Sequence, residues 1–388
     1  MAGESAIPRW FRYNPTTEAN VVSEPAFRWG ILGTAGIARK NWRAIQLTGN
    51  ATVAGVASRD LERARRFIDE CQAEAPMAVR PAAFGTYADL LASDVDGVYV
   101  PLPTGLRKPW VIRAADAGKH VVGEKPCAGS VADLREMLAA CRRSGVQFMD
   151  GVMFMHSRRL ARLREVLHDE EEVGQIRRLS SSFTFRQPPE FFTDNIRTDA
   201  ALEPAGSLGD LGWYCIRFFL WALDWRMPGV VDARILADTG RPHSDTRVPT
   251  ELSGELRFDG GVSAGFFCSF LTDTEQWAAV SGTAGRVHVP DFVLPFAGSE
   301  VGFDVHHVDC LAGGCEIRLQ PSVRRVTVDE HSHGHATAQE TAMFRGFVDR
   351  IRSGKPDPAW AEAALKTQIV MDACLASARD GGRAVAIG

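Results

Sequence analysis

The chain has 388 residues. At about 150 residues per domain this length predicts two or three domains, and it excludes a mini-domain held by disulfides. A composition of 45% hydrophobic and 24% charged residues is typical of a globular protein with a large core. Lys and Arg (44) nearly balance Asp and Glu (48), which argues against a dedicated nucleic-acid binder. No uncharged apolar stretch is long enough to span a membrane, so we expect no membrane partner.

The cysteines and the first residues bear on the cellular compartment. Eight cysteines are scattered without Cys-x-x-Cys pairs, and we expect reduced thiols in the core. The first 25 residues contain charged side chains and no apolar core of signal-peptide length. We therefore predict a cytoplasmic protein. Residues 1–26 are expected to form an extended arm, in which the apolar stretch Trp10 to Tyr13 serves assembly.

From Phe27 to Met149, short apolar strands alternate with amphipathic helices. Such alternation predicts a doubly wound parallel sheet with right-handed crossovers, a Rossmann domain over residues 27–150. Ser58 or Asp60 is the expected cap of the second helix. The expected strands are 29–33, 52–57, 98–100, 121–122 and 146–149, and the expected helices are 37–47, 61–71, 110–117 and 131–144.

After Gly151 the hydrophobic pattern changes to a period of two, which is typical of strands. We predict a C-terminal α+β domain over residues 151–388, with a large and mostly antiparallel open sheet. The expected strands are 178–185, 231–236, 251–258, 262–270, 277–281, 286–289 and 315–319, and the expected helices are 160–167, 211–223, 341–353 and 361–378.

A glycine-containing turn lies where the first strand meets the first helix. Small residues there let the backbone approach a pyrophosphate, which a helix N-terminus can bind. Ala stands in two places where a dinucleotide turn usually has Gly, and a turn that serves only packing is the alternative. We predict that a dinucleotide cofactor contacts Gly33, Thr34, Ala35, Gly36 and Ile37.

The tip of the second strand indicates which dinucleotide is bound. An acidic residue at this tip would accept hydrogen bonds from the adenosine ribose and favour NAD. Here Ser58 and Arg59 come first, and an arginine pairs well with a ribose 2′-phosphate. We therefore predict that Ser58 and Arg59 select NADP. If Asp60 turns toward the ribose instead, NAD is the alternative cofactor.

Three further motifs identify a family. They are Leu102-Pro103-Thr104 after the strand at 98–100, Gly123-Glu124-Lys125-Pro126 after the strand at 121–122, and Gly206-Ser207-Leu208-Gly209-Asp210-Leu211-Gly212-Trp213-Tyr214. Together with the turn at 33–38, they resemble the glucose-fructose oxidoreductase / inositol dehydrogenase (Gfo/Idh/MocA) family over nearly the whole chain. Inositol dehydrogenases usually have His at the position of Tyr214. A Tyr at this position is similar to the branch of dimeric dihydrodiol dehydrogenase and NADP-dependent xylose dehydrogenase.

The resemblance implies site residues and an assembly. It places Leu102, Pro103, Thr104, Glu124 and Lys125 at the cofactor. It also implies substrate contacts by Arg197 and Trp213, and a homodimer or homotetramer that forms through the C-terminal sheet.

Lys125, Asp210 and Tyr214 are the predicted catalytic group. Asp210 and Tyr214 are four residues apart, so on a helix they share a face. A phenol, with an ordinary pKa of about 10, is a poor base at neutral pH, but a neighbouring ammonium lowers that pKa and polarises a substrate oxygen. We predict Tyr214 as proton relay, Lys125 as electrostatic partner or co-donor, and Asp210 as the group that orients them. The alternatives are a surface lysine, a core tyrosine and a helix-capping aspartate.

Two charged stretches of the sequence each allow two interpretations. Arg107 and Lys108 stand near the place where the family usually has a histidine, and they either receive an acidic or phosphorylated substrate or face solvent. His331, His333 and His335 alternate in a polar stretch that invites a metal, but an exposed loop is favoured because the family chemistry needs no metal.

These observations favour an NADP-dependent oxidoreductase that acts on a hydroxyl or ketone of a sugar, a sugar derivative or a cyclic diol. A second hypothesis is an enzyme that retains its nicotinamide and uses transient oxidation for elimination, hydrolysis or epimerisation. A third is a non-catalytic nucleotide-binding protein. The combination of Lys125, Asp210 and Tyr214 argues against the third, because a binding module needs no such group.

Overall fold

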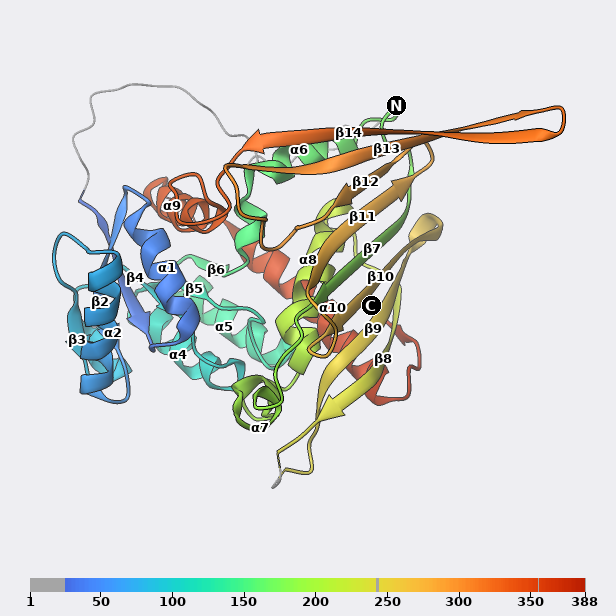
Figure 1. Cartoon of the computed structure of the whole chain (residues 1–388). Helices are drawn as coiled ribbons and strands as arrows, with labels where there is room; N and C mark the ends of the chain where they lie inside the picture. Colours follow the sequence, from blue (N-terminus) through green and yellow to red (C-terminus); the bar gives the residue numbers. More distant parts are fainter. Residues whose placement is uncertain (1–24, 242–243, 355, 388) are drawn as a thin grey trace.

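The computed structural model describes residues 25–241, 244–354 and 356–387. Two sheets dominate this part of the chain, one in each half of the sequence, and helices lie between and around them (Figure 1). The predicted fold class, an α/β Rossmann domain followed by an α+β domain, is confirmed. The expected arm at residues 1–26 lies almost entirely outside the described residues.

The N-terminal half forms a parallel sheet with strand order β3-β2-β1-β4-β5-β6. All its pairings within the described residues are parallel. The order reverses between β1 and β4, which is where doubly wound sheets bind ligands. Its elements are β1 (Phe27–Leu32), α1 (Gly36–Gln46), β2 (Ala51–Ala57), α2 (Leu61–Glu74), β3 (Ala82–Phe84), α3 (Tyr87–Ala92), β4 (Gly97–Val100), α4 (Thr104–Asp116), β5 (His120–Gly123), α5 (Val131–Arg143) and β6 (Phe148–Asp150).

Local sequence explains why α2 begins where it does. Of the two expected caps it is Asp60 that acts, because its carboxylate accepts a hydrogen bond from the Glu62 amide at 2.9 Å. Ala64, Phe67, Ile68 and Cys71 then recur at helical spacing and are buried against the sheet. With its carboxylate at the helix start, Asp60 does not line the cavity at the end of β2.

The C-terminal half contains a second sheet with strand order β14-β13-β12-β11-β7-β10-β9-β8-β15. Its strands pair antiparallel except for β7 and β10, which are parallel. Its elements are α6 (Arg158–Leu167), β7 (Ile176–Thr184), α7 (Phe191–Asp194), a π-helical turn (Leu208–Gly212), α8 (Trp213–Ala222), β8 (Val230–Thr239), β9 (Val248–Phe258), β10 (Val262–Ser269), β11 (Glu275–Gly282), β12 (Arg286–Val289), β13 (Glu300–Gly313), β14 (Glu316–Asp329), α9 (Gln339–Arg352), α10 (Pro358–Arg379) and β15 (Val385–Ala386), with 3-10 turns at Met153–His156, Ile196–Thr198 and Asp259–Gly261.

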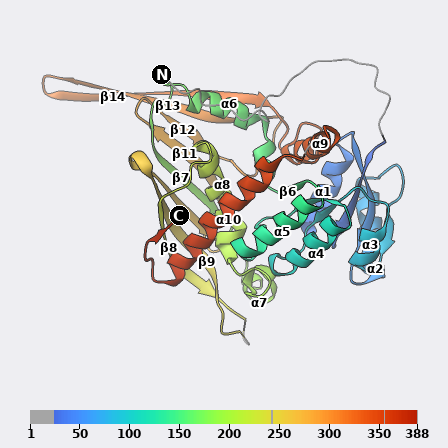
Figure 2. The same cartoon turned by 180° about the vertical axis from the view of Figure 1, so that it is seen from behind.

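The two faces of this second sheet differ. Alternate residues such as Ala264, Phe266 and Cys268 on β10 are buried under α8 and α10, which Figure 2 shows from behind. On the opposite face, for example at Ser263 and Gly265, no helix of the described chain covers the strands. We call this uncovered side the open face.

The hairpin of β13 and β14 is much longer than the sequence pattern predicted. Both strands have fourteen residues and pair throughout, although only 315–319 was expected as a strand. Figures 1 and 2 show its tip reaching well past the rest of the sheet, on the side away from α8 and α10. The outer part, residues 306–323, is called the ribbon below.

Helix α9 lies late in the chain but packs against the N-terminal sheet. The rings of Phe344 and Phe347 lie 5.4 Å from the ring of Trp29 on β1, and Phe344 also contacts Tyr99 on β4. A buried ion pair between Asp150 and Arg217 joins β6 to α8, and Arg217 Nε donates to Thr367 on α10 at 2.7 Å. The two halves therefore share core residues.

All eight cysteines are free, and six of them are buried. Cys310 and Cys315 are exposed near the ribbon tip, which corrects the expectation that the thiols lie in the core. No helix in the described residues is long and apolar enough to cross a membrane.

Candidate active site

A cavity of about 930 Å³ lies at the carboxyl edge of the N-terminal sheet, between the two halves of the chain. It brings together most of the residues singled out from the sequence. Those that line it are Gly33, Thr34, Ala35, Gly36, Ile37, Ser58, Arg59, Leu102, Pro103, Glu124, Lys125, Arg197, Asp210 and Tyr214.

The glycine turn is shaped for close approach of a ligand. Gly33 has φ +109°, which side chains rarely adopt, and a Cβ there would lie 3.2 Å from Leu102. At Gly36 a Cβ would meet nothing within 4 Å, so its backbone faces open space. Helix α1 begins at Gly36, and its N-cap residue Ala35 has no side chain that caps the helix, which leaves the first amides free for an anion.

One end of the cavity is basic. Arg59, Arg63 and Tyr87 line it together, and Arg63 Nε donates to the Thr34 hydroxyl at 2.8 Å. Arg63 was not predicted from the sequence; it lies in the first turn of α2, whereas Arg59 precedes the cap of that helix. Both guanidinium groups belong to exposed residues at this rim.

Lys125 and Arg197 hold Asp210 between them. Lys125 Nζ lies 2.8 Å from Asp210 Oδ1 and 2.7 Å from its backbone oxygen, and Arg197 Nε lies 2.6 Å from Oδ2. Burial alone would raise the pKa of Asp210, but the two cations outweigh it and hold that pKa below its usual range. The carboxylate is thus ionised and orients Lys125, so it is not a helix cap.

Tyr214 lies beside this group but does not bond to Lys125. The ammonium of Lys125 lies 4.7 Å from the centre of the Tyr214 ring, over its face, and the phenol hydroxyl is 3.8 Å from Met153 Sδ. Burial, with the charges of Glu124 and Asp210, raises the pKa of Tyr214 well above its ordinary value. The prediction that Lys125 lowers this pKa is therefore wrong for the geometry found here.

A buried chain of polar groups supports the loop that carries Lys125. Asn41 Nδ2 donates to the Tyr99 hydroxyl at 2.7 Å, and that hydroxyl donates to Glu124 Oε1 at 2.5 Å. Because Glu124 also accepts from the Lys125 amide at 3.3 Å, the chain fixes the backbone next to the lysine.

Two predicted contact residues lie outside the cavity lining. Trp213 is fully buried, with Arg217 5.7 Å above its ring, because the helix turns it into the core. Thr104 is buried and its hydroxyl donates to Glu203 at 2.6 Å. Trp213 therefore does not reach a substrate in this cavity, and Thr104 acts on the site through Glu203, which does line it.

The cations at 107 and 108 lie in different surroundings: Arg107 lines the cavity, and Lys108 lies at the surface. The Arg107 guanidinium is buried and donates to the backbone oxygens of Leu102, Pro126 and Cys127. Arg107 thus ties together two of the loops that line the cavity. Lys108 pairs with Asp133 and with a neighbouring glutamate.

An aromatic wall, which was not predicted from the sequence, lines the C-terminal side of the cavity. Phe183 lies near the end of β7, Phe185 directly follows that strand, and Phe191 begins α7; all three line the cavity with Met153 and Gln187. Phe183 and Phe185 are two residues apart, so they share one face of the strand. This spacing of two aromatic residues is the sequence signal that could have predicted the wall.

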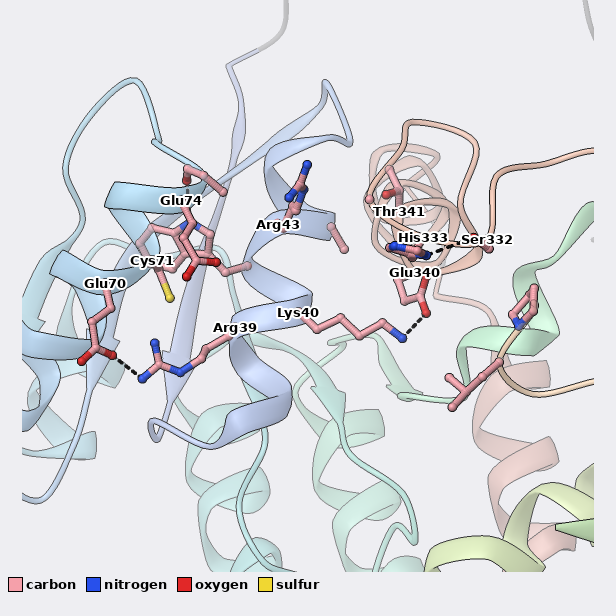
Figure 3. Close-up of a pocket in the computed structure, with 16 residues that line it drawn as sticks. Arg39, Lys40, Arg43, Glu70, Cys71, Glu74, Ser332, His333, Glu340 and Thr341 are labelled. Atoms are coloured by element: carbon pink, nitrogen blue, oxygen red, sulfur yellow. Dashed lines mark hydrogen bonds and ion pairs between the residues drawn. The ribbon is translucent and has the colours of Figure 1, made fainter. Parts of the chain in front are cut away.

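A second cavity of about 380 Å³ lies next to the first, between α1, α2 and the start of α9. Figure 3 shows that its charges are largely paired, because Lys40 Nζ bonds to Glu340 at 2.5 Å and Arg39 bonds to Glu70. Lys40 and Glu340 line both cavities. Their ion pair therefore forms part of the wall between them.

The histidine stretch lies at the rim of this second cavity. His331 and His335 stack with ring centres 3.7 Å apart, and His333 lies beside the Ser332 hydroxyl at 3.0 Å. Among the described residues, no three His, Cys, Asp or Glu side chains are grouped so that they could hold a metal.

Family models match both halves of the chain. The model of an oxidoreductase family with an NAD-binding Rossmann fold matches residues 27–152, and that of the GFO/IDH/MocA C-terminal domain matches residues 160–288.

Curated relatives include a D-xylose 1-dehydrogenase (NADP⁺) of Haloferax volcanii, which is 36% identical over 71% of this chain and 80% of its own length. A trans-1,2-dihydrobenzene-1,2-diol dehydrogenase of Mus musculus is 30% identical over 70% of this chain and 76% of its own length. Among solved structures, a 3-ketoreductase from Actinomadura kijaniata in complex with NADP and TDP-benzene has a TM-score of 0.74 at 26% identity, covering 92% of this chain and 98% of that one.

Proposed function

The chain belongs to the GFO/IDH/MocA oxidoreductase family, as its motifs predicted, and from that premise we propose that it is an NADP-dependent oxidoreductase of sugar-like or cyclic diol substrates. It transfers a hydride between the nicotinamide and a hydroxyl or ketone carbon. The observation that carries the proposal is the group of Lys125, Asp210 and Arg197 beside the buried Tyr214 in the main cavity.

The residues at the cofactor end fit a dinucleotide. The open backbone at Gly36 and the uncapped start of α1 suit a pyrophosphate. Arg59 and Arg63 suit a ribose 2′-phosphate, and Asp60, which would favour NAD, is engaged as a helix cap. When bound, the cofactor supplies or accepts the hydride.

The side chains of the catalytic group supply the proton and the charge. Because Tyr214 keeps its proton at neutral pH, it donates that proton to the substrate oxygen during carbonyl reduction and takes it back in the reverse direction. Lys125, held by Asp210, places its ammonium where a substrate oxygen gains negative charge. Arg197 shares the Asp210 carboxylate and lies where it can bind a further substrate hydroxyl.

The opposite wall suits one kind of substrate. Phe183, Phe185 and Phe191 offer apolar ring faces, while Gln187 and Arg197 offer donors. A pyranose or cyclic diol has an apolar carbon face and polar edges, so it matches both surfaces. The relatives named above support this class, since their names include a xylose and a dihydrodiol dehydrogenase.

The first experiment is a fluorescence titration of the purified protein with NADPH and NADH, after a check for bound cofactor. We expect much tighter binding of NADPH, followed by NADPH turnover with aldoses, ketosugars or cyclic diols. Equal or tighter binding of NADH would overturn the assignment of Arg59. Cofactor that is already present and does not exchange would favour the transient-oxidation enzyme instead.

Assembly and compartment belong to the same proposal. We infer a homodimer or homotetramer that forms through the open face of the C-terminal sheet, which no described helix covers. We also infer a cytoplasmic location, supported by eight free thiols, two of them exposed.

A further inference from the structure

The ribbon has one apolar and one polar face. In its ladder, Val308 pairs with Pro321, Cys310 with Leu319, and Ala312 with Ile317, so these six side chains lie on the same face. On the other face the pairs are His307 with Ser322, Asp309 with Gln320, and Leu311 with Arg318. Placing apolar and polar side chains on opposite faces does not stabilise a strand pair that water surrounds on both sides.

The apolar face lacks a partner within the described chain. Ile317 is 76% exposed and Leu319 is 66% exposed, and Val308 and Val323 are each 59% exposed. A two-stranded hairpin by itself is at best marginally stable in water, and a packed third layer is what normally supports one. The ribbon therefore needs a cover on this face.

The pairing register joins this apolar face to the open face of the sheet. His306 on the ribbon pairs with Arg286, which pairs with Ser281, which pairs with Arg178, and all four lie on the uncovered side. Figure 1 shows the ribbon projecting beyond the sheet on that side. A molecule seated on the open face would therefore meet the apolar face of the ribbon.

We propose that the ribbon is a dimerisation arm, whose apolar face packs against a second copy of this chain seated on the open face. The inference rests on the proposed assembly through the sheet and adds the residues that clasp the partner. A two-fold pair of identical chains gives each ribbon a partner and leaves neither apolar face in water.

The charges of the open face suit a second copy. Arg178 pairs with Glu255, and Arg257 pairs with Asp232, so both signs alternate across the strands. Nucleic acid or an anionic membrane selects a surface of one positive sign, which this face does not offer. The same alternating pattern on two copies permits opposite charges to face each other.

The area is large enough for a stable pair of chains. Six strands of about eight residues, spaced about 4.8 Å apart, give an open face of about 750 Å², and the ribbon adds about 250 Å². Stable complexes bury about 800 Å² per partner. The sheet and the ribbon together exceed this area.

Sedimentation velocity of the full chain over a range of concentrations tests the proposal. We expect a dimer or a dimer-based tetramer for the wild type, and dimerisation at least about 100-fold weaker for Leu319→Glu and Ile317→Glu, because the new carboxylate would be buried against apolar groups. The matched control is Gln320→Glu, one position away on the polar face, which should assemble like the wild type. NADPH titration of each variant shows that the site remains folded.

A second readout uses the thiols. In a Cys315→Ser background, Cys310 is the one exposed thiol of the described chain, and its alkylation by iodoacetamide should slow at least about 10-fold as the dimer forms. A wild type that stays monomeric overturns both the assembly and the arm. A dimer that resists Leu319→Glu and leaves Cys310 reactive overturns the arm alone.

Discussion

Replacing Arg59 and Arg63 with Ala should weaken NADPH binding much more than NADH binding. Both residues line the basic end of the main cavity, and both are exposed there. A unit charge pair at about 4 Å in water is worth about 1 kcal/mol, and a phosphate monoester carries a charge of about −1.5 to −2. Each arginine is therefore worth about 1.5 kcal/mol, or about 10-fold in the dissociation constant, and the double variant should lose about 100-fold.

NADH is the internal reference in this experiment because it lacks the 2′-phosphate. Arg66→Ala removes the same charge from the same helix at a residue outside the cavity lining, and it should change neither constant by more than about two-fold. The assay is fluorescence titration at low and high salt, where the loss should shrink as salt screens the charges. Equal weakening of NADPH and NADH, or no weakening of either, would refute the reasoning.

Three further predictions concern the catalytic group and stability. Tyr214→Phe should lower kcat by about 100-fold or more without changing the NADPH dissociation constant, because only the proton donor is lost; steady-state kinetics beside titration checks this. Asp210→Asn should lower kcat/KM by about 100-fold, since Lys125 and Arg197 lose their shared carboxylate, and an unchanged value would show that it does not position them. Burial, and secondarily the charge of Arg217, lowers the pKa of His156 to about 4. An unfolded histidine has a pKa of about 6.5, so stability present above pH 6.5 is lost as the pH falls toward 4, by about 2 kcal/mol at pH 5. His156→Phe should lose correspondingly less between pH 7.5 and 5 in urea unfolding, and equal losses would contradict the assignment.

The sequence predicted the N-terminal fold well because its signals are local. Apolar runs gave the strands, helical spacing gave α2, and the glycine turn between β1 and α1 indicated a ligand edge. Lys125 and Asp210 were paired by the resemblance, since 85 residues separate them in the chain. The local sequence pattern around each residue could not have shown that Lys125 and Asp210 form a pair.

The sequence-based predictions that were wrong or incomplete failed for physical reasons. Trp213 was placed at the substrate because it adjoins Tyr214, but consecutive helical residues point about 100° apart, and Trp213 turns into the core. The ribbon was missed over much of its length because Pro321, which has no backbone N–H, is typical of a strand end, and Leu311 breaks the alternation of apolar and polar residues. The buried role of Arg107 could not be predicted, because the backbone oxygens that it bonds belong to loops that come together only in the folded protein.

The packing of α9 on β1 has a consequence for how the protein is made. Trp29 leaves the ribosome more than three hundred residues before Phe344 and Phe347, whose rings cover it. Throughout that interval the nascent N-terminal half displays an apolar patch that chaperones can bind. A fragment that ends after β6 would retain this patch permanently, and such a fragment should aggregate even though it contains every strand of its sheet.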